Sequence, residues 1–310
     1  YKPNAKKEDL QRAVSLAKAD LMSEMVYEFT ELQGLMGAYY AIEQGESKEV
    51  ATAINEQYLP DGEDSDLPST PMSAIVAMSI KLDTLLALFS INQIPTGSRD
   101  PFALRRAVNG LIKIVSKYNL KFNIEKDLEV LFSEYEKFSP DSFKFKLSKE
   151  DLKRFFRERI KQYYKVNPSV IEAVLASGER EIVAMGEKIE ALDAIVNAEG
   201  FSESFSTFKR VANITKDIDL SQYMSVDVKL FEDKSEEELY ASYNGVASKS
   251  YDSYEEELDA LLGLKPQLDK FFKDVMVNTE DEAVKNNRKS LVASIYKSIL
   301  NIADIKEVSV

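Results

Sequence analysis

Apolar side chains recur at three- and four-residue spacing along most of the chain. The pattern is clear in residues 10–25 and 104–115, where one apolar face repeats at every helical turn. Such spacing is typical of amphipathic α-helices, whereas a half-buried β-strand alternates apolar and polar residues. Alternating runs are scarce in this sequence. The pattern therefore predicts an all-α fold.

Short sequence signals predict where several helices begin. Asp100-Pro101 and Asn167-Pro168 each combine a capping side chain with a proline suited to the first helical turn. A serine followed three residues later by an acid suggests capping boxes at Ser148/Asp151, Ser235/Glu238 and Ser253/Glu256. In the last third of the chain, these signals predict helices over residues 227–247, 254–262, 266–277 and 282–303.

Charge changes sign along the chain and suggests a domain boundary. The length of 310 residues indicates about two domains. Residues 1–98 have a net charge of −8, residues 99–165 of +7 and residues 166–310 of −12. The reversal near Lys165, followed by Asn167-Pro168, predicts domains over residues 1–165 and 166–310. Glu199-Gly200 is a second candidate boundary.

The block of residues 99–165 is the only cationic one, although the whole chain has a net charge of −13. A local excess of Lys and Arg can attract phosphates. An alternative is an ordinary amphipathic helix whose aromatic residues form the core and whose charges face solvent. The block includes Lys144 and Lys146, and the candidates for phosphate contacts are Arg105, Arg106, Lys153, Arg154 and Arg157.

The residue types that are missing exclude several kinds of chemistry. The chain has no Cys, His or Trp, so it has no Ser-His-Asp triad, no Cys-His pair and no zinc site built from thiolate or imidazole. No disulfide can form, which is compatible with a reducing cytoplasm. Neither a GxG nor a GxxxxGK motif occurs. We expect no cofactor and no metal in this chain.

Some acidic residues lie in conspicuous places. The loop of residues 61–66 is rich in acids, but its glycine is misplaced for an EF-hand and the closing Glu is absent, so we predict a solvated loop. Asp20 and Asp83 lie in apolar helical runs. We predict that these two carboxylates cap helices or pair with Lys18 and Lys81 rather than catalyse a reaction.

The sequence gives no indication of a membrane protein. Its longest uncharged stretches, Leu67–Ile80 and Thr84–Ser98, have 14 and 15 residues, shorter than the roughly 18–20 that a membrane span needs. No targeting signal is present, and residue 1 is Tyr rather than Met. We therefore expect a cytoplasmic chain without a membrane partner that belongs to a longer polypeptide.

Six segments, taken in order, resemble the beta subunits of bacterial tetrameric glycyl-tRNA synthetases. The resemblance extends from about Ala13 to Asp304. The segments are KADLMSEMVYEFTELQGLMGAYYA (18–41), AINEQYLP (53–60), KLDTL (81–85), PTGSRDPFALRRA (95–107), FKRVANI (208–214) and FFKDVMV (271–277).

This resemblance implies a division of labour in an α2β2 enzyme. The alpha subunit would activate glycine with ATP, and the beta subunit would engage tRNA(Gly), with no role for DNA. It also implies that an HD-like helical domain is followed by a helical-bundle anticodon-binding domain with a core over about residues 200–306. Residues 286–304 resemble the closing helix of that second domain. The candidates for reading anticodon bases, on these family-like segments, are Arg210, Asn213, Asn287 and Arg288.

The HD-like label comes with a departure from the hydrolases of that superfamily. Those enzymes bind metal through His and Asp, but this chain has no His and has Ser79-Ile80-Lys81 where its relatives typically have Ala-Asp-Lys. We therefore expect no intact metal site and a tRNA-binding, non-catalytic role. Two alternatives remain open, a metal-dependent phosphohydrolase and a purely structural scaffold for the alpha subunit.

Overall fold

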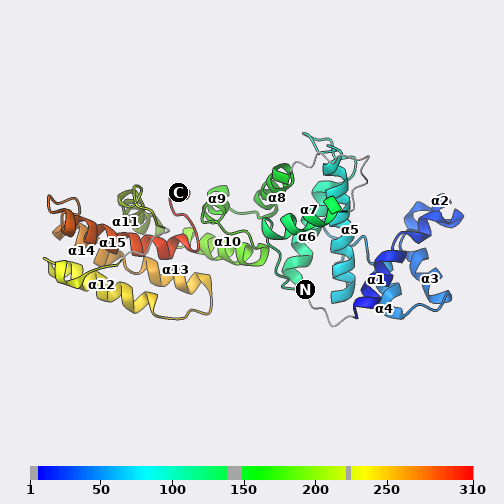
Figure 1. Ribbon diagram of the computed structural model, residues 1–310. Coiled ribbons are helices and arrows are strands. Elements are labelled where there is room, and N and C mark those ends of the chain that lie inside the picture. The colour runs from blue at the N-terminus through cyan, green and yellow to red at the C-terminus, as the bar shows by residue number, and fades with distance from the viewer. Residues whose placement is uncertain (1–5, 138–148, 221–224, 310) are drawn as a thin grey trace. The chain divides into compact units, whose positions relative to one another are not determined.

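The computed structural model describes residues 6–137, 149–220 and 225–309, and the chain divides into two compact units. The first unit comprises Tyr1–Tyr163 with Glu181–Val183, and the second comprises Tyr164–Arg180 with Ala184–Val310. Both units are built from helices (Figure 1). The described residues contain no strand, only two isolated β-bridges. The prediction of an all-α fold is confirmed, while the HD-like and anticodon-binding labels stay predictions.

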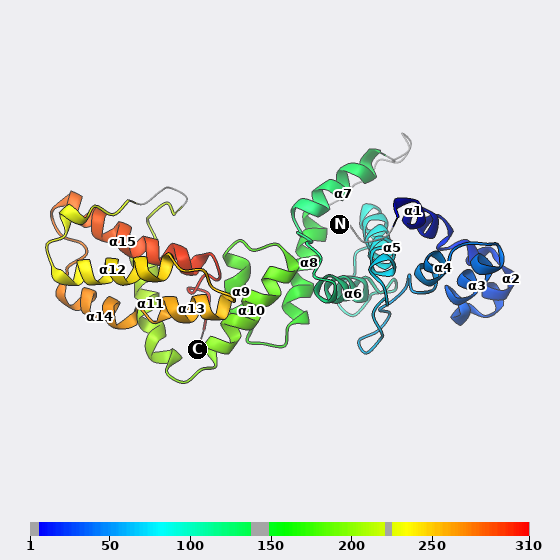
Figure 2. The ribbon, with the colours of Figure 1, turned by 90° about the horizontal axis from the view of Figure 1, so that it is seen from below.

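In the first unit, helix α5 lies between α4 and α6 (Figure 2), α6 packs against α8, and α7 also contacts α8. Short 3-10 helices, labelled η, join some of the α-helices. The segments in chain order are α1 (Lys7–Leu16), η1 (Ala19–Met22), α2 (Glu24–Glu28), η2 (Thr30–Leu32), α3 (Leu35–Glu43), α4 (Lys48–Asn55), α5 (Pro71–Ser90), α6 (Leu104–Lys117), α7 (Lys126–Lys137) and α8 (Lys149–Tyr163).

Helix α5 is the longest helix of the first unit. The Thr70 side chain caps it by accepting the N–H of Ser73, and Pro71 occupies its first turn. The helix continues through Lys81 and Asp83, so it is longer than the uncharged stretches of the sequence. By length and apolar composition alone it could span a membrane. However, 56% of its apolar window is buried inside the structure. This burial fits a helix at the centre of a protein core.

In the second unit, helix α15 contacts α11, α12, α13 and η3 and buries Leu291, Ile295 and Ile299. After α15 the chain returns to α9, where the Asp304 N–H donates to the Ala173 carbonyl at 2.8 Å. The segments are α9 (Pro168–Ala176), α10 (Ile182–Val196), α11 (Phe201–Ile214), η3 (Val228–Leu230), α12 (Lys234–Ala247), α13 (Tyr254–Leu262), α14 (Lys265–Asp274) and α15 (Glu282–Leu300).

Several predicted helix boundaries are confirmed. Asn167 caps α9 at Pro168, and Ser253 caps α13 by accepting the N–H of Glu256. The predicted helices over residues 266–277 and 282–303 correspond to α14 and α15 with small shifts at their ends. Ser148 lies outside the described residues.

Two helices, α12 and α6, begin later in the sequence than predicted. The helix predicted from residue 227 begins at Lys234, whereas Asp227 caps the short helix η3 with its side chain and is also bonded by the Asn287 amide. The capping box there is formed by Asp233 and Glu236, not by Ser235 and Glu238.

Helix α6 begins at Leu104, three residues after the predicted start. The Asp100 carboxylate still caps it, but from a greater distance along the chain, since its two oxygens accept the N–H groups of Leu104 and Arg105. Ala103, directly before the helix, has a φ of 55° and therefore cannot belong to it.

Candidate nucleic-acid interface

Two predicted phosphate contacts lie at the start of α6. The Arg105 guanidinium donates to the Gly97 carbonyl at 2.6 Å, and Arg106 donates to the Asp61 carbonyl at 3.0 Å. Both acceptors are neutral, so these hydrogen bonds orient the two side chains without cancelling their charges. The N-terminus of a helix also carries the positive end of the helix dipole. The Asp100 carboxylate that caps α6 offsets part of this positive potential, so the attraction for anions comes from the two guanidinium groups.

Arg159 of α8 adds a third guanidinium to this region. Its Nε and Nη2 donate to the Asn109 side-chain oxygen at 3.3 and 3.4 Å, and Nη1 donates to the Gln162 side chain. Burial lowers the pKa of Arg159, and the positive charge of Arg105 lowers it further, while Asp100 opposes both effects. The influence of Arg105 indicates that the two guanidinium groups are close enough to repel each other.

We call Arg105, Arg106 and Arg159 the arginine cluster. Within the described ranges of the chain, no carboxylate oxygen lies within 4.0 Å of any of these three guanidinium groups. The planar guanidinium fork matches two oxygens of one phosphate, and neighbouring positive charges attract anions. The cluster is therefore suited to binding the phosphates of a nucleic acid.

The other predicted phosphate contacts, on α8, are paired with acids. The Lys153 ammonium is buried and lies 2.6 Å from a Glu129 oxygen and 3.0 Å from a Glu125 oxygen, with Glu150 at 3.3 Å. The hydrogen bond to Glu129 raises the pKa of Lys153 despite its burial. Because this lysine faces three acids, it has little charge left to attract a phosphate.

Arg154 and Arg157 are paired in the same way. Arg154 lies 2.5 Å from Asp151, and Arg157 lies 2.7 Å from Glu125. On the opposite side of α8, Phe155 and Phe156 are buried. These two aromatic residues belong to the core, as the alternative interpretation of α8 predicted, but Lys153 is buried and does not face solvent. Lys144 and Lys146 lie outside the described residues.

Two of the predicted base readers are exposed on one helix of the second unit. Arg210 and Asn213 lie three residues apart on α11, so they share one face. The Arg210 guanidinium lies 4.3 Å from the centre of the Phe272 ring. The Asn213 side chain makes no hydrogen bond to the part of the chain that the structure describes. An exposed guanidinium and a free amide can both contact an unpaired base.

The other two predicted base readers lie in the interior of the second unit. Both groups of the Asn287 amide bond the backbone of Asp227, at 2.8 and 3.0 Å. Arg288 is 6% exposed, and its Nε and Nη2 lie 2.9 Å from oxygens of Glu236 and Glu232, respectively. Both glutamates lie more than 50 residues before Arg288 in the sequence. This arrangement favours a structural role for both residues.

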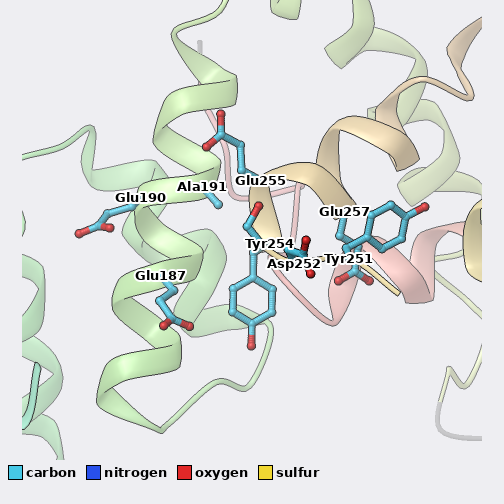
Figure 3. Close-up of a pocket in the computed structure, with 9 residues that line it drawn as sticks. Glu187, Glu190, Ala191, Tyr251, Asp252, Tyr254, Glu255 and Glu257 are labelled. Carbon is cyan, nitrogen blue, oxygen red and sulfur yellow. The ribbon is translucent and has the colours of Figure 1, made fainter. Parts of the chain in front are cut away.

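One pocket of the second unit is acidic. It has a volume of about 580 Å³ and lies between α10 and the start of α13 (Figure 3). Its carboxylates come from Glu187, Glu190, Asp252, Glu255 and Glu257. These charges repel phosphate, so the pocket is a poor site for a nucleic-acid backbone. Over the described ranges, no group of three or more acidic side chains has the geometry to hold a metal ion.

The sequence did not single out Arg159 from the other cations of its block. Helical spacing shows which side of α8 is apolar, but it does not show that Arg159 meets Asn109, 50 residues earlier, instead of an acid. Only the packing of α6 against α8 brings Arg159 and Arg105 together.

Comparison with known proteins gives a consistent result. The family model described as glycyl-tRNA synthetase beta subunit matches residues 2–176. The glycine–tRNA ligase beta subunit of Helicobacter pylori (strain G27) is 42% identical over 305 residues, 97% of this chain and 43% of that protein. The protein of the same name from Streptococcus pyogenes serotype M2 (strain MGAS10270) is 36% identical over 302 residues, again 97% and 43%. The chain spans less than half the length of these relatives. It belongs to the glycyl-tRNA synthetase beta subunit family.

Proposed function

We propose that this chain is a tRNA-binding, non-catalytic portion of the beta subunit of a glycine–tRNA ligase. It positions tRNA(Gly), while a separate alpha subunit uses ATP to join glycine to the tRNA in an α2β2 assembly in the cytoplasm. The observation that carries the proposal is the arginine cluster, which holds three guanidinium groups without carboxylate partners in a chain of this family. Phosphate contacts there would position the tRNA.

The exposed pair on α11 supplies the second part of the proposal. Arg210 and Asn213 are the predicted base readers that remain accessible, and we assign them the contact with the anticodon. The second unit lies in the acidic part of the chain, so general attraction of RNA is weak there. Binding at α11 then depends on a few well-placed donors.

Reversing the charges of Arg105 and Arg106 tests the phosphate contacts. The double variant Arg105→Glu/Arg106→Glu is expected to bind tRNA at least about tenfold more weakly, to a similar degree for all tRNAs, because phosphates carry no sequence information. The slope of log affinity against log salt concentration should fall by about 1 for each lost contact. Fluorescence anisotropy with labelled tRNA at several salt concentrations measures both quantities.

The matched control is Lys137→Glu/Arg154→Glu, which changes the net charge by the same amount. Both of these cations are exposed and already paired, Lys137 with Glu134 and Arg154 with Asp151. The control should therefore lose much less affinity. Equal losses in the two double variants would mean that only net charge matters and would exclude the cluster as a binding site.

The non-catalytic part of the proposal has a direct test. The chain lacks the glycine-rich motifs of nucleotide sites, so glycine-dependent exchange between ATP and pyrophosphate should stay at background. The assay needs a preparation shown to be free of alpha subunit. Exchange above background in that preparation would contradict the assignment.

A second candidate function is that this chain acts as a scaffold to which the alpha subunit binds. An exposed apolar surface favours this function. In the first unit, the exposed apolar side chains concentrate on η1, α2, η2 and α3, which contact one another. Met22 is 89% exposed and Tyr27 is 80% exposed. Exposed apolar patches of this kind mark protein interfaces. We assign this surface to the alpha subunit, since the relatives are named as one subunit of a larger enzyme.

An aspartate at position 22 tests this assignment. Met22→Asp places a charge in the apolar surface and is expected to weaken association with the alpha subunit by about tenfold or more, while tRNA affinity stays unchanged. The control is Ile91→Asp, which changes another exposed apolar residue of the same unit. Biolayer interferometry against immobilised alpha subunit gives the two affinities. If both variants bind as the wild type does, the alpha subunit does not dock here.

A further inference from the structure

The loop before α6 exposes an aromatic residue. Phe102 is 49% exposed, although phenylalanine is usually buried in folded proteins. Among the residues that the structure describes, its ring packs against no other aromatic ring and no cation. About half of this residue is therefore accessible to another molecule.

Hydrogen bonds hold this loop in one conformation. Thr96 and Arg99 exchange two backbone hydrogen bonds, at 3.1 and 2.9 Å, and the Ala103 N–H donates to the Asp100 carbonyl at 3.2 Å. The Asp100 carboxylate also accepts the first N–H groups of α6, which ties the loop to the helix. Because Phe102 is presented by an ordered loop, little conformational freedom is lost when a ligand binds to it.

Two guanidinium groups accompany this aromatic residue. Arg105 folds back onto the loop, since its guanidinium donates to the Gly97 carbonyl at 2.6 Å. Three peptide units separate Arg105 from Phe102, so their Cα atoms lie at most about 11 Å apart. Arg99, within the loop, is exposed, and its side chain makes no hydrogen bond or ion pair with the described part of the chain. The loop thus combines an exposed aromatic residue with cations that have no carboxylate partner.

This combination matches the chemistry of an unpaired nucleotide. A guanidinium group binds phosphate oxygens, and the flat face of a base stacks on an aromatic side chain. Inside a double helix, neighbouring base pairs cover both faces of each base, so a paired base cannot stack on Phe102. Proteins that bind single-stranded nucleic acids use cations along the backbone together with aromatic side chains for the bases.

We propose that Phe102 stacks on an unpaired base of the bound RNA, while Arg99 and Arg105 contact the adjoining phosphates. This inference rests on the proposed function, because it requires RNA at the arginine cluster. It adds a preference for single-stranded RNA, which phosphate contacts alone do not give. In a tRNA, both the unpaired 3′ end and the loops supply such a base.

The absence of tryptophan from the chain allows a direct test. Phe102→Trp keeps an aromatic ring for stacking and introduces a single indole, whose fluorescence is quenched when a base stacks on it. In the 310-residue chain, tRNA and a single-stranded oligoribonucleotide should both quench this fluorescence. A blunt duplex of the same oligoribonucleotide should quench it much less.

The matched control is Phe29→Trp. Phe29 is 52% exposed and directly follows α2, which lies on the other side of α5 from α6 (Figures 1 and 2). This variant has the same single indole at similar exposure, but far from the loop before α6. RNA should therefore leave its fluorescence unchanged.

The variant Phe102→Ala measures the contribution of stacking to affinity. It should bind the single-stranded oligoribonucleotide about tenfold more weakly, which corresponds to the loss of one stacked base. Its affinity for the duplex should stay unchanged, and Phe102→Trp should bind both RNAs as the wild type does. Arg105→Glu/Arg106→Glu should weaken binding of both RNAs. Fluorescence anisotropy with labelled RNA gives these affinities.

The outcomes separate this inference from the proposed function. A wild-type chain that binds neither tRNA nor the oligoribonucleotide would overturn both. If tRNA binds but quenches Phe102→Trp no more than Phe29→Trp, or if Phe102→Ala keeps its full affinity for the single strand, only the base contact at Phe102 is excluded. Removing the unpaired 3′ nucleotides of the tRNA identifies the source of the base: quenching is lost if the base belongs to the 3′ end and is kept if it belongs to a loop.

Discussion

Replacing Arg288 with alanine is expected to lower the free energy of unfolding by about 3–5 kcal/mol, because the buried Glu236 carboxylate then loses its cationic partner. Arg288 Nε and Nη2 lie 2.9 and 3.2 Å from the two Glu236 oxygens, and Nη1 donates to the Met276 carbonyl at 3.2 Å. Burial alone would raise the pKa of Glu236. Hydrogen bonds from Arg288 and from the backbone outweigh burial and hold this pKa below its usual range.

Arg210→Ala is the matched control, since both arginines were predicted to read bases. Arg210 is exposed, with its guanidinium over the Phe272 ring, and its loss should cost less than about 1 kcal/mol of stability. Urea unfolding at neutral pH, followed by circular dichroism, measures both variants.

For RNA binding, the larger effect is expected from Arg210→Ala, the variant with the smaller effect on stability. Arg210→Ala should lower the preference for tRNA(Gly) over a tRNA with a changed anticodon by about tenfold, whereas Arg288→Ala should leave this ratio of affinities unchanged. An Arg288→Ala protein that unfolds like the wild type and loses the preference would contradict the structural role of this residue.

The helical architecture could be predicted because its signals are local. The spacing of apolar residues and the caps at Asn167 and Ser253 act over one or two helical turns. The helix start predicted at residue 227 was wrong because the capping box of Asp233 and Glu236, itself a local signal, begins the helix at Lys234. Contacts between residues far apart in the sequence could not be predicted. Asn287 bonds the backbone of Asp227, and no local pattern encodes that contact.

The candidate site could be predicted only in part for the same reason. Counting charges located the cationic block of residues 99–165, but not which of its charges are cancelled. Lys153 meets Glu129 across 24 residues, and Arg288 meets Glu236 across 52. Such pairs depend on how helices pack, so the sequence presented paired and unpaired cations alike. The sequence predicted that Asp20 caps a helix or pairs with Lys18, but it could not show which helix is capped, because Oδ2 accepts the N–H groups of Gly34 and Gly37 at the start of α3.

Lys81 makes the stability of the first unit depend on pH. This lysine of α5 is 8% exposed, and its ammonium donates to the Tyr58 carbonyl at 2.8 Å. A Cβ atom at Gly110 would lie only 2.9 Å from the Lys81 Cε, so the lysine side chain occupies space that a larger residue at position 110 would need. Burial lowers the pKa of Lys81 to about 8, although the negative charge of Asp61 acts in the opposite direction. The folded protein therefore holds this proton less tightly than the unfolded chain does.

Stability should rise as the pH increases from 7 to 9.5, by about 2 kcal/mol from Lys81 alone. Between the folded pKa of about 8 and the unfolded pKa near 10.4, the unfolded state binds more protons, so raising the pH favours folding. Above pH 10 the tyrosines reverse the trend, since burial raises the pKa of Tyr58 in the folded state. Below pH 8 the full cost of the buried charge is present.

The Lys81→Met variant separates this effect from all other titrations. Methionine keeps a long side chain beside Gly110 but carries no charge, so the rise in stability between pH 7 and 9.5 should shrink by about 2 kcal/mol relative to the wild type. At pH 7 the variant avoids the cost of a buried ammonium but leaves the Tyr58 carbonyl without this donor, which costs about 1–3 kcal/mol. The absolute stability at one pH is therefore a poor test, and the pH dependence is the decisive one. Urea unfolding of both proteins at four or more pH values gives it, and parallel curves for the two proteins would show that Lys81 keeps an ordinary pKa in the folded state.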